Sequence, residues 1–409
     1  MTTAGAGKKL SADVKQYLVV TGNYWAFTLT DGALRMLVVL HFHQLGYAPL
    51  QIAALFLFYE IFGVITNLVG GYLGARIGLN STMNIGLGLQ VIALLMLAIP
   101  TVILTPLWVM GAQGISGIAK DLNKMSAKST IKLLVPSDQQ GKLFKWVALL
   151  TGSKNALKGV GFFLGGALLA LLDFVGAVVA MAAVLGVIWI ASLLLLKKDL
   201  GKAKQKPKFR ELFSKSRAVN ILSAARLFLF GARDVWFVVA LPVFLSSQLG
   251  WSFWWVGGFL AIWIIGYGFV QSIAPVLINQ GENSAPGGLH VFVWALILTG
   301  IPAAIALGFN SSLPIEAVLI GGLLIFGAVF AINSSLHSYL IVNYAKSDGV
   351  SLDVGFYYMA NALGRLVGTL LSGWIYQTEG LVACLWVSSA FIGLAALISL
   401  GLPRTVSNN

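Results

Sequence analysis

The sequence predicts an all-α membrane protein with about twelve transmembrane helices arranged in two six-helix pseudo-symmetric halves. Its composition, the spacing of its apolar runs and an internal repeat each point to this fold class. The chain has 409 residues, of which 58% are hydrophobic and 10% are charged. In soluble domains about a quarter of the residues are charged. A chain of this composition is expected to have lipid as its solvent.

Apolar runs long enough to cross a bilayer, about 20 residues each, recur along the chain. We expect spans at residues 17–43, 51–77, 82–104, 107–133, 143–171, 175–196, 219–245, 253–278, 289–308, 318–344, 354–377 and 381–402. Little of the chain lies outside them, so no separate soluble domain is expected. The first run continues into charged sequence without a small-residue cleavage site, which favours a retained helix over a signal peptide.

An internal repeat relates the fourth and fifth spans to the tenth and eleventh. The matching positions are Gly117 and Gly327, Asn123 and Asn333, Asn155 and Asn361, Lys158 and Arg365, and Gly161 and Gly368. We therefore expect an N-terminal half at residues 1–196, a basic linker at 197–217 and a C-terminal half at 218–409. In transporters built from such parallel halves, the substrate binds near the bilayer midplane between them.

Basic residues gather at alternate joints between the spans, which accounts for the formal net charge of +13. The joint between the two halves is the most basic, whereas the opposite joints carry only Asp173, Glu316 and Glu379. The positive-inside rule then places both termini and the linker in the cytoplasm. This placement argues against nucleic-acid binding. The single Cys384 excludes an intramolecular disulfide and a Cys-rich metal site. No metal site, cofactor or catalytic residue is expected.

Charged residues inside the spans are the candidates for function, because each costs about 2.5 to 3.5 kcal/mol at a helix centre. Asp31 and Arg35 can pair as neighbours one helical turn apart. Lys120, Lys124 and Lys128 share one face of the fourth span, with Lys128 expected to reach the aqueous edge. The candidates for contact with an anionic substrate are Arg35, Lys120, Lys154, Lys158, Arg233, Arg365, Asn155, Asn361 and Tyr358. The candidates for charge balance or proton coupling are Asp31, Glu60, Asp121 and Asp234.

Two other interpretations of these charges stay open. The Arg and Asp residues could form structural ion pairs between helices, and the lysines could line a hydrated vestibule. A receptor or a membrane enzyme would need an extramembrane domain or a catalytic constellation, and the sequence offers neither. It also has no phosphate-binding loop for ATP, so transport would draw on the membrane potential, the substrate gradient or a coupled proton.

Four stretches carry a resemblance to a known family. They are QYLVVTGNYWAFTLTDGALRMLVVLHFHQLGY, SGIAKDLNKMSAKSTIKLLVP, TGSKNALKGVGFFLGG and SAARLFLFGARDVWFVVALP. The chain resembles the ArsJ-type organoarsenical efflux permeases of the major facilitator superfamily from Gln16 to Pro403. Its turn GYLGARIGLN is also similar to the superfamily signature, with Ala75 where that signature has an acid.

The resemblance implies a bacterial inner-membrane exporter of 1-arseno-3-phosphoglycerate, which confers arsenate resistance by alternating access. It also implies a functional link to a glyceraldehyde-3-phosphate dehydrogenase, which forms that compound from arsenate. We expect a monomer whose partners are the lipid bilayer and the small anion. An antiporter of organophosphate and phosphate is the alternative, because spacing alone does not distinguish an arsenate ester from a phosphate ester.

Overall fold

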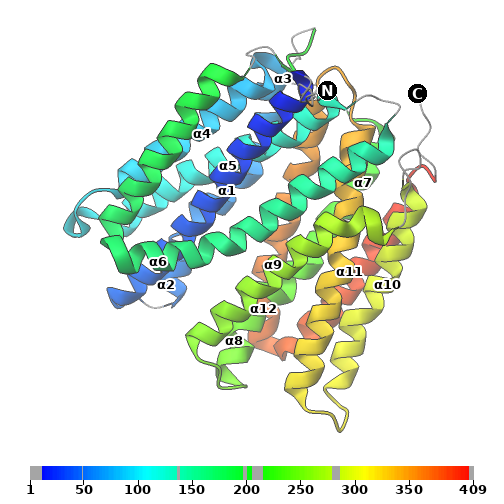
Figure 1. Ribbon diagram of the computed structural model, residues 1–409. Coiled ribbons are helices and arrows are strands. Elements are labelled where there is room, and N and C mark those ends of the chain that lie inside the picture. The colour runs from blue at the N-terminus through cyan, green and yellow to red at the C-terminus, as the bar shows by residue number, and fades with distance from the viewer. Residues whose placement is uncertain are drawn as a thin grey trace, which may run out of the picture.

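The computed structural model describes residues 12–47, 49–135, 139–196, 200–204, 215–278 and 286–404 (Figure 1). Its regular elements over those residues are helices. The N-terminal half contains α1 (Ala12–Gln44), α2 (Pro49–Ala54), α3 (Leu57–Ile77), α4 (Leu79–Leu97), the 3-10 turn η1 (Thr101–Ile103), α5 (Pro106–Leu134) and α6 (Gln140–Leu195). The C-terminal half contains α7 (Arg217–Phe237), α8 (Ala240–Ser247), α9 (Phe253–Leu277), α10 (Gly288–Gly308), α11 (Ile315–Tyr344) and α12 (Val350–Ser399).

These helices form the twelve expected spans, although two pairs of spans are continuous. α6 has 56 residues and bends at Asp173, and α12 has 50 residues and bends at Gly380. Both bends lie where the sequence places a joint between two spans. The predicted fold class is confirmed. The predicted boundaries of the halves stay a prediction, because residues 197–199 and 205–214 of the basic linker lie outside the described residues, as do residues 1–11.

Two spans expected to be continuous are broken in the structure. The second divides into α2 and α3 at Leu55 and Phe56, and the seventh divides into α7 and α8 at Val238 and Val239. The first break contains no Pro or Gly. The second lies four residues before Pro242, which has no N–H to donate to the Val238 carbonyl and so interrupts the helix there. At the second break, the backbone N–H groups of Val239 and Ala240 donate to Ser372 Oγ at 3.3 and 3.1 Å. Such pairing allows irregular backbone at membrane depth.

The two halves repeat the same helix crossing. In the N-terminal half α6 crosses α1 where Gly161 meets Gly32, and a Cβ on Gly161 would lie 2.7 Å from the carbonyl oxygen of Leu29. In the C-terminal half α12 crosses α7 where Gly368 meets Gly231, and a Cβ on Gly368 would lie 2.5 Å from the Gly231 oxygen. The repeat pair Gly161 and Gly368 therefore marks equivalent close contacts between backbones.

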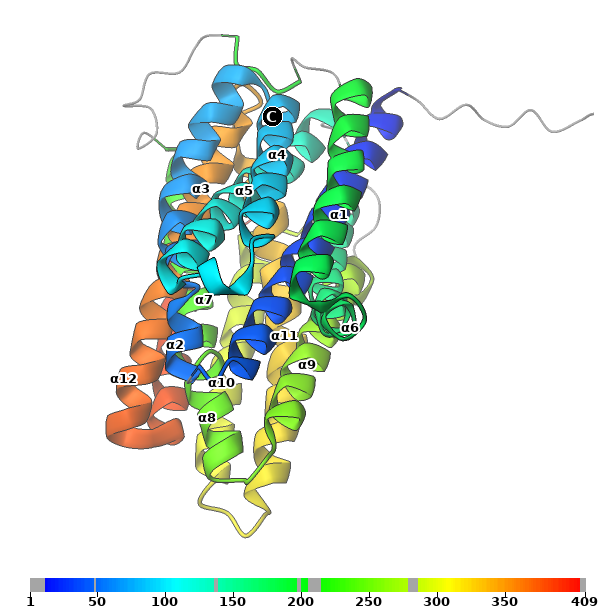
Figure 2. The same cartoon turned by 90° about the vertical axis from the view of Figure 1, so that its left-hand side faces the viewer.

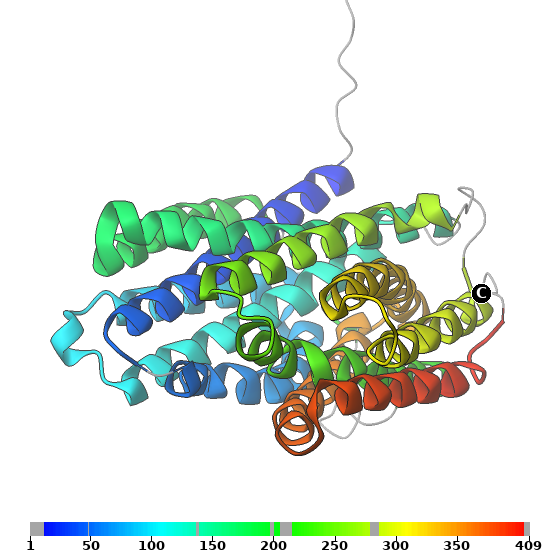
Figure 3. The ribbon, with the colours of Figure 1, turned by 90° about the horizontal axis from the view of Figure 1, so that it is seen from below.

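The halves meet at one end of the bundle and separate at the other. α1 begins and α12 ends at the same end, here called the termini side (Figure 1). Toward that side α3 packs on α12 through Gly71 and Ser351, and α6 packs on α9 through Gly152 and Gly268. The opposite end is called the far side, and Figure 2 and Figure 3 show the bundle from the side and from that end.

A cleft of about 930 Å³ opens between α1, α6 and α9 toward the far side. Met36, Phe163 and Trp254 are among its lining residues. The molecule is thus closed at the termini side and open at the far side, as expected for one state of a carrier that alternates between two openings.

The contact between α6 and α9 predicts the effect of adding one methyl group. A Cβ on Gly268 would lie 2.4 Å from the backbone nitrogen of Ala156, whereas a Cβ on Gly266, exposed on the same helix, meets nothing within 4 Å. Gly268→Ala should lower the melting temperature, with a loss of about 1 to 3 kcal/mol from overpacking. Gly266→Ala is the matched control and should be neutral or stabilising by up to about 1 kcal/mol. Equal melting temperatures of the two purified variants would contradict this packing.

Candidate anion site between the two halves

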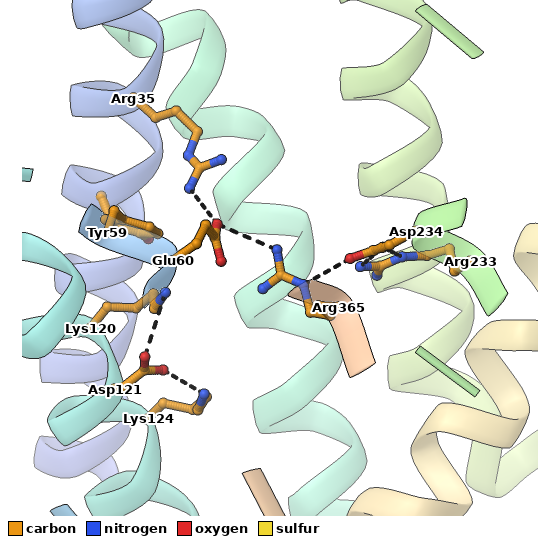
Figure 4. Close-up of polar contacts among 10 residues, drawn as sticks. Arg35, Tyr59, Glu60, Lys120, Asp121, Lys124, Arg233, Asp234 and Arg365 are labelled. Atoms are coloured by element: carbon orange, nitrogen blue, oxygen red, sulfur yellow. Dashed lines mark hydrogen bonds and ion pairs between the residues drawn. The ribbon is translucent and has the colours of Figure 1, made fainter. Parts of the chain in front are cut away.

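A chain of ion pairs crosses the centre of the molecule from one half to the other (Figure 4). Glu60 Oε1 on α3 lies 3.3 Å from Arg35 Nη2 on α1 and 3.6 Å from Arg365 Nη2 on α12. Arg365 Nε then donates to Asp234 Oδ2 on α7 at 3.1 Å, and Asp234 Oδ1 lies 2.5 Å from Arg233 Nη2. Four helices of the two halves therefore share one set of charges.

Solvent access differs sharply along this chain. The Asp234 side chain is 0% exposed, whereas those of Glu60 and Arg365 are 34% and 31% exposed. Asp234 is thus a buried counter-ion for two guanidinium groups. Glu60 and the two guanidiniums that face it are partly exposed, so a ligand that reaches the centre of the molecule can contact them.

The expected pair of Asp31 with Arg35 is replaced by other contacts. Asp31 Oδ1 accepts a hydrogen bond from the Tyr59 hydroxyl at 2.7 Å, and Arg35 pairs with Glu60 instead. The Tyr59 ring also lies 4.8 Å from Arg35 Cζ and 3.8 Å from Lys120 Nζ. One aromatic ring thus orients two cations from different helices by cation–π contact. Tyr59 is not among the site residues that the sequence predicts. The sequence feature that could have indicated it is its position beside Glu60 in an apolar run.

A second cluster of charges lies on α5. Asp121 Oδ1 lies 2.5 Å from Lys124 Nζ, and Asp121 Oδ2 lies 3.6 Å from Lys120 Nζ. The Asp121 side chain is buried, and the two lysine side chains are partly exposed. Asp121 therefore forms ion pairs with two of the three lysines on this face.

Lys154 and Lys158 on α6 form no ion pair with a carboxylate among the described residues. Lys154 Nζ reaches only the side-chain oxygen of Asn155, at 3.3 Å. Lys158, the repeat equivalent of Arg365, makes no ion pair or hydrogen bond in the described part of the chain, although it is electrostatically coupled to Arg35 and Asp31. The two halves are therefore asymmetric: the C-terminal cation has its own buried carboxylate, and the N-terminal one has none.

A row of amides and hydroxyls also joins the halves. Asn155 Nδ2 donates to Gln271 Oε1 at 2.6 Å, and Gln271 Nε2 donates to Ser334 Oγ at 3.2 Å. Ser334 and Asn361 in turn accept hydrogen bonds from the buried Arg226, at 3.1 and 2.9 Å. Asn155 and Asn361 are thus held by protein partners in this state, so their contact with substrate stays a prediction.

The expectation that Lys128 reaches the aqueous edge is wrong. Its side chain is buried, and its ammonium group donates to the Tyr358 hydroxyl across the interface between the halves and lies 3.5 Å from Ser338 Oγ. The Tyr358 ring lies 4.7 Å from Lys124 Nζ and 4.9 Å from Lys128 Nζ. Lys128 sits deep because α12 covers α5 here, and helix position alone does not reveal that cover.

Basic side chains outnumber acidic ones in this central region. The basic residues are Arg35, Lys120, Lys124, Lys128, Lys154, Lys158, Arg226, Arg233 and Arg365, and the acidic residues are Asp31, Glu60, Asp121 and Asp234. Guanidinium forks bind carboxylate and phosphate oxygens in pairs, and ammonium groups add point charges. An anion with several oxygens is the ligand that this arrangement can stabilise.

A bundle of two repeated six-helix halves with a charged, partly exposed centre between them has the architecture of an alternating-access transporter. The model of the Major Facilitator Superfamily matches residues 18–285, and the chain belongs to that superfamily. It is a multi-pass membrane transporter and not an enzyme. No curated protein matches the chain.

Several solved structures share this fold. The human organic anion transporter MFSD10 (TETRAN) is 18% identical, with a TM-score of 0.75 over 95% of this chain and 100% of that one. A bacterial homologue of the iron transporter ferroportin in an outward-facing state is 13% identical, with a TM-score of 0.73 over 96% and 99%. The E. coli fucose:proton symporter FucP is 12% identical, with a TM-score of 0.73 over 95% and 99%. At these identities the likeness concerns the fold.

The buried carboxylate of Asp234 makes a prediction about stability. Asp234→Asn removes the counter-ion of Arg233 and leaves Arg365 with the more distant Glu60, which should cost about 3 to 5 kcal/mol of folding free energy. Adding Arg233→Gln removes one of the two cations, so the double variant should recover a large part of that loss. Thermal unfolding of the purified single and double variants measures both effects. A double variant no more stable than Asp234→Asn would show that the two residues do not act as a pair.

Proposed function

We propose that this transporter exports a multiply charged organic oxyanion, foremost 1-arseno-3-phosphoglycerate, and so confers resistance to arsenate. The observation that carries the proposal is the pair of guanidiniums of Arg35 and Arg365, which face each other across the halves with roughly a third of each side chain open to solvent. Lys154 and Lys158 add two basic side chains that form no ion pair with a described carboxylate. The identity of the anion comes from the resemblance of the sequence to the organoarsenical efflux permeases.

The remaining named candidates complete a site for several anionic groups. Arg35, Arg233, Arg365, Lys120, Lys154 and Lys158 would contact carboxylate, phosphate and arsenate oxygens, with Asn155, Asn361 and Tyr358 as neutral hydrogen-bonding partners. Asp31, Glu60, Asp121 and Asp234 would balance the cations of the empty site or carry a coupled proton. A substrate with anionic groups at both ends would use cations from both halves at once, which is what alternating access requires of a central site.

The orientation follows from the basic joints. Arg76, Lys142 and Lys215 lie on the termini side, and the far-side joints carry Asp173, Glu316 and Glu379. We propose that the termini side is cytoplasmic in a bacterial inner membrane, so that the open cleft faces outward. With the cytoplasm negative, export of each net negative charge is then favoured by about 2.3 kcal/mol per 100 mV. Uniport and proton-coupled transport are both compatible with that driving force.

A second candidate is an antiporter that exchanges an organophosphate for inorganic phosphate. The same guanidinium pair favours it, since a phosphate ester and an arsenate ester present alike oxygens. The organic anion transporter among the solved structures fits the same broad substrate class by its name. Proteoliposomes loaded with phosphate distinguish the candidates, because an antiporter takes up labelled 3-phosphoglycerate only when phosphate is inside.

The proposed substrate predicts a phenotype in whole cells. Bacteria that express this chain together with a glyceraldehyde-3-phosphate dehydrogenase should accumulate less arsenic from arsenate than bacteria with the dehydrogenase alone. Arg365→Gln should remove that difference, because it deletes the guanidinium that spans the two halves. The measurement is cell-associated arsenic at equal levels of membrane-inserted protein.

Arg76→Gln is the matched control, since Arg76 is an arginine on the termini side that donates to Tyr72 at 2.6 Å. This variant should protect cells as the wild type does. Equal arsenic accumulation with and without the wild-type transporter would refute efflux of the arsenic compound, and the antiport assay would then decide the remaining candidate.

A further inference from the structure

Glu60 differs from the other acidic residues of the central region in its partners. A single oxygen, Oε1, serves one guanidinium of the N-terminal half and one of the C-terminal half. Both contacts are long, at 3.3 and 3.6 Å, whereas Asp234 holds Arg233 and Arg365 at 2.5 and 3.1 Å. Since 3.6 Å is beyond the range of a hydrogen bond, Glu60 attracts Arg365 mainly as a charge. The Glu60 carboxylate is therefore held at longer distances from its two cations than the Asp234 carboxylate is from its own.

The guanidinium of Arg35 has binding capacity that Glu60 leaves unused. Its Nε is buried and has no hydrogen-bond partner. The group itself is held in place by the rings of Phe56 and Tyr59, whose centroids lie 5.1 and 4.8 Å from Cζ. A buried donor without an acceptor is costly. An anion with two or more oxygens could supply the acceptor that the single Glu60 oxygen does not.

Glu60 is also the acid that can leave its place at least cost. Its side chain is 34% exposed, whereas Asp121 and Asp234 are 1% and 0% exposed and Asp31 is buried. Moving a buried carboxylate away from its cation is penalised by several kcal/mol, but a carboxylate that already contacts water avoids most of that penalty. Glu60 also lies in the first turn of α3, directly after the break at Leu55 and Phe56, so it is positioned at an interruption of its span.

We infer that the Glu60 carboxylate is an internal counter-ion that the substrate anion displaces: it neutralises Arg35 and Arg365 in the empty transporter and leaves them when the anion binds. This inference rests on the proposed function and locates the first contact of the anion between those two guanidiniums. The asymmetry of the halves supports it, because Lys158 lacks the buried carboxylate that its equivalent Arg365 has in Asp234. The N-terminal half thus has a displaceable acid, Glu60, whereas the C-terminal half has a buried and fixed one, Asp234.

The displacement has a consequence for transport. An empty carrier returns to its starting state with Glu60 between the two guanidiniums, and a loaded carrier moves with the anion there instead. Without the Glu60 charge, Arg35 and Arg365 would lose the carboxylate between them whenever the site is empty, and like charges in such an interface cost several kcal/mol. The loaded carrier would be unaffected by that repulsion.

The test compares Glu60→Gln with the wild type, using 3-phosphoglycerate as the probe anion. Removing the competing carboxylate should tighten binding on the order of tenfold, measured as the concentration of probe that raises the melting temperature of purified protein. Exchange of labelled 3-phosphoglycerate across proteoliposomes should persist, while net efflux into anion-free buffer should fall by a similar factor. A residue that only stabilises the fold would lower binding, exchange and efflux together.

Two further variants make the result decisive. Glu316→Gln is the matched control, since Glu316 is an exposed acid outside the central region that accepts a hydrogen bond from Trp251, and it should match the wild type throughout. Glu60→Asp keeps the charge but shortens the reach by one methylene, so its affinity should lie between wild type and Glu60→Gln. If Glu60→Gln folds poorly, the affinity of Glu60→Asp is measured in its place. An affinity of Glu60→Asp no higher than that of the wild type would then overturn the inference.

The outcomes also separate the inference from the proposed function. Wild-type protein that binds and exchanges 3-phosphoglycerate, with Glu60→Gln binding no tighter, would overturn the displacement by Glu60 and leave the function standing. If neither the wild type nor Glu60→Gln binds 3-phosphoglycerate or inorganic phosphate, the organic oxyanion function itself is refuted.

Discussion

The ion pair between Glu60 and Arg365 links the two halves of this transporter at the depth where its charges gather. Through Arg35 on one side and Asp234 on the other, it extends over α1, α3, α12 and α7. A charge in a membrane-spanning helix needs a partner, water or a ligand, and here the partner of a cation commonly lies on a different helix. The central charges therefore restrain how the halves can move relative to each other. Any anion that enters the site acts on that restraint directly.

Glycine contacts determine which surfaces can slide and which cannot. Gly161 and Gly368 bring backbones together inside each half, whereas Gly71 and Gly268 do so between the halves. The first pair keeps each half a unit. The second pair brings backbones together toward the termini side, where polar contacts also join the halves, among them Lys132 with the Asn343 carbonyl and Asn343 with Gln140. Opening of this side must break those contacts. The closed termini side and the open far side are thus consistent with one position of a two-position carrier.

Much of this architecture could be predicted from the sequence, because lipid imposes a length and a polarity on every span. The repeat also paired Gly161 with Gly368, and the structure places both at equivalent helix crossings. The break at Phe56 could not be predicted, since no Pro or Gly marks it. The break at Val239 has a signal in Pro242, which the predicted span did not take into account, but the hydrogen bonds that compensate it come from Ser372, far along the chain. Helix breaks of that kind depend on tertiary partners, which a pattern along one segment does not contain.

The sequence predicted which charged residues lie in the candidate site, but it did not predict which of them form ion pairs. The sequence placed Arg35, Glu60, Asp234 and Arg365 inside the spans, but it paired Arg35 with its neighbour Asp31. Contacts between helices decide such choices, and the hydroxyl of Tyr59 donates to the carboxylate of Asp31 instead. Lys128 shows the same limit, because its depth depends on the cover that α12 provides. The sequence identified which residues carry charge, and the fold decides which of them face one another.

The most direct test of this picture is an experimental structure of the transporter with 3-phosphoglycerate bound. The prediction is that anion oxygens lie within hydrogen-bonding distance of the Arg35 and Arg365 guanidiniums, and that the Glu60 carboxylate has moved away from both. An anion bound elsewhere, or bound while Glu60 still lies between the two guanidiniums, would contradict the central role given to this ion pair.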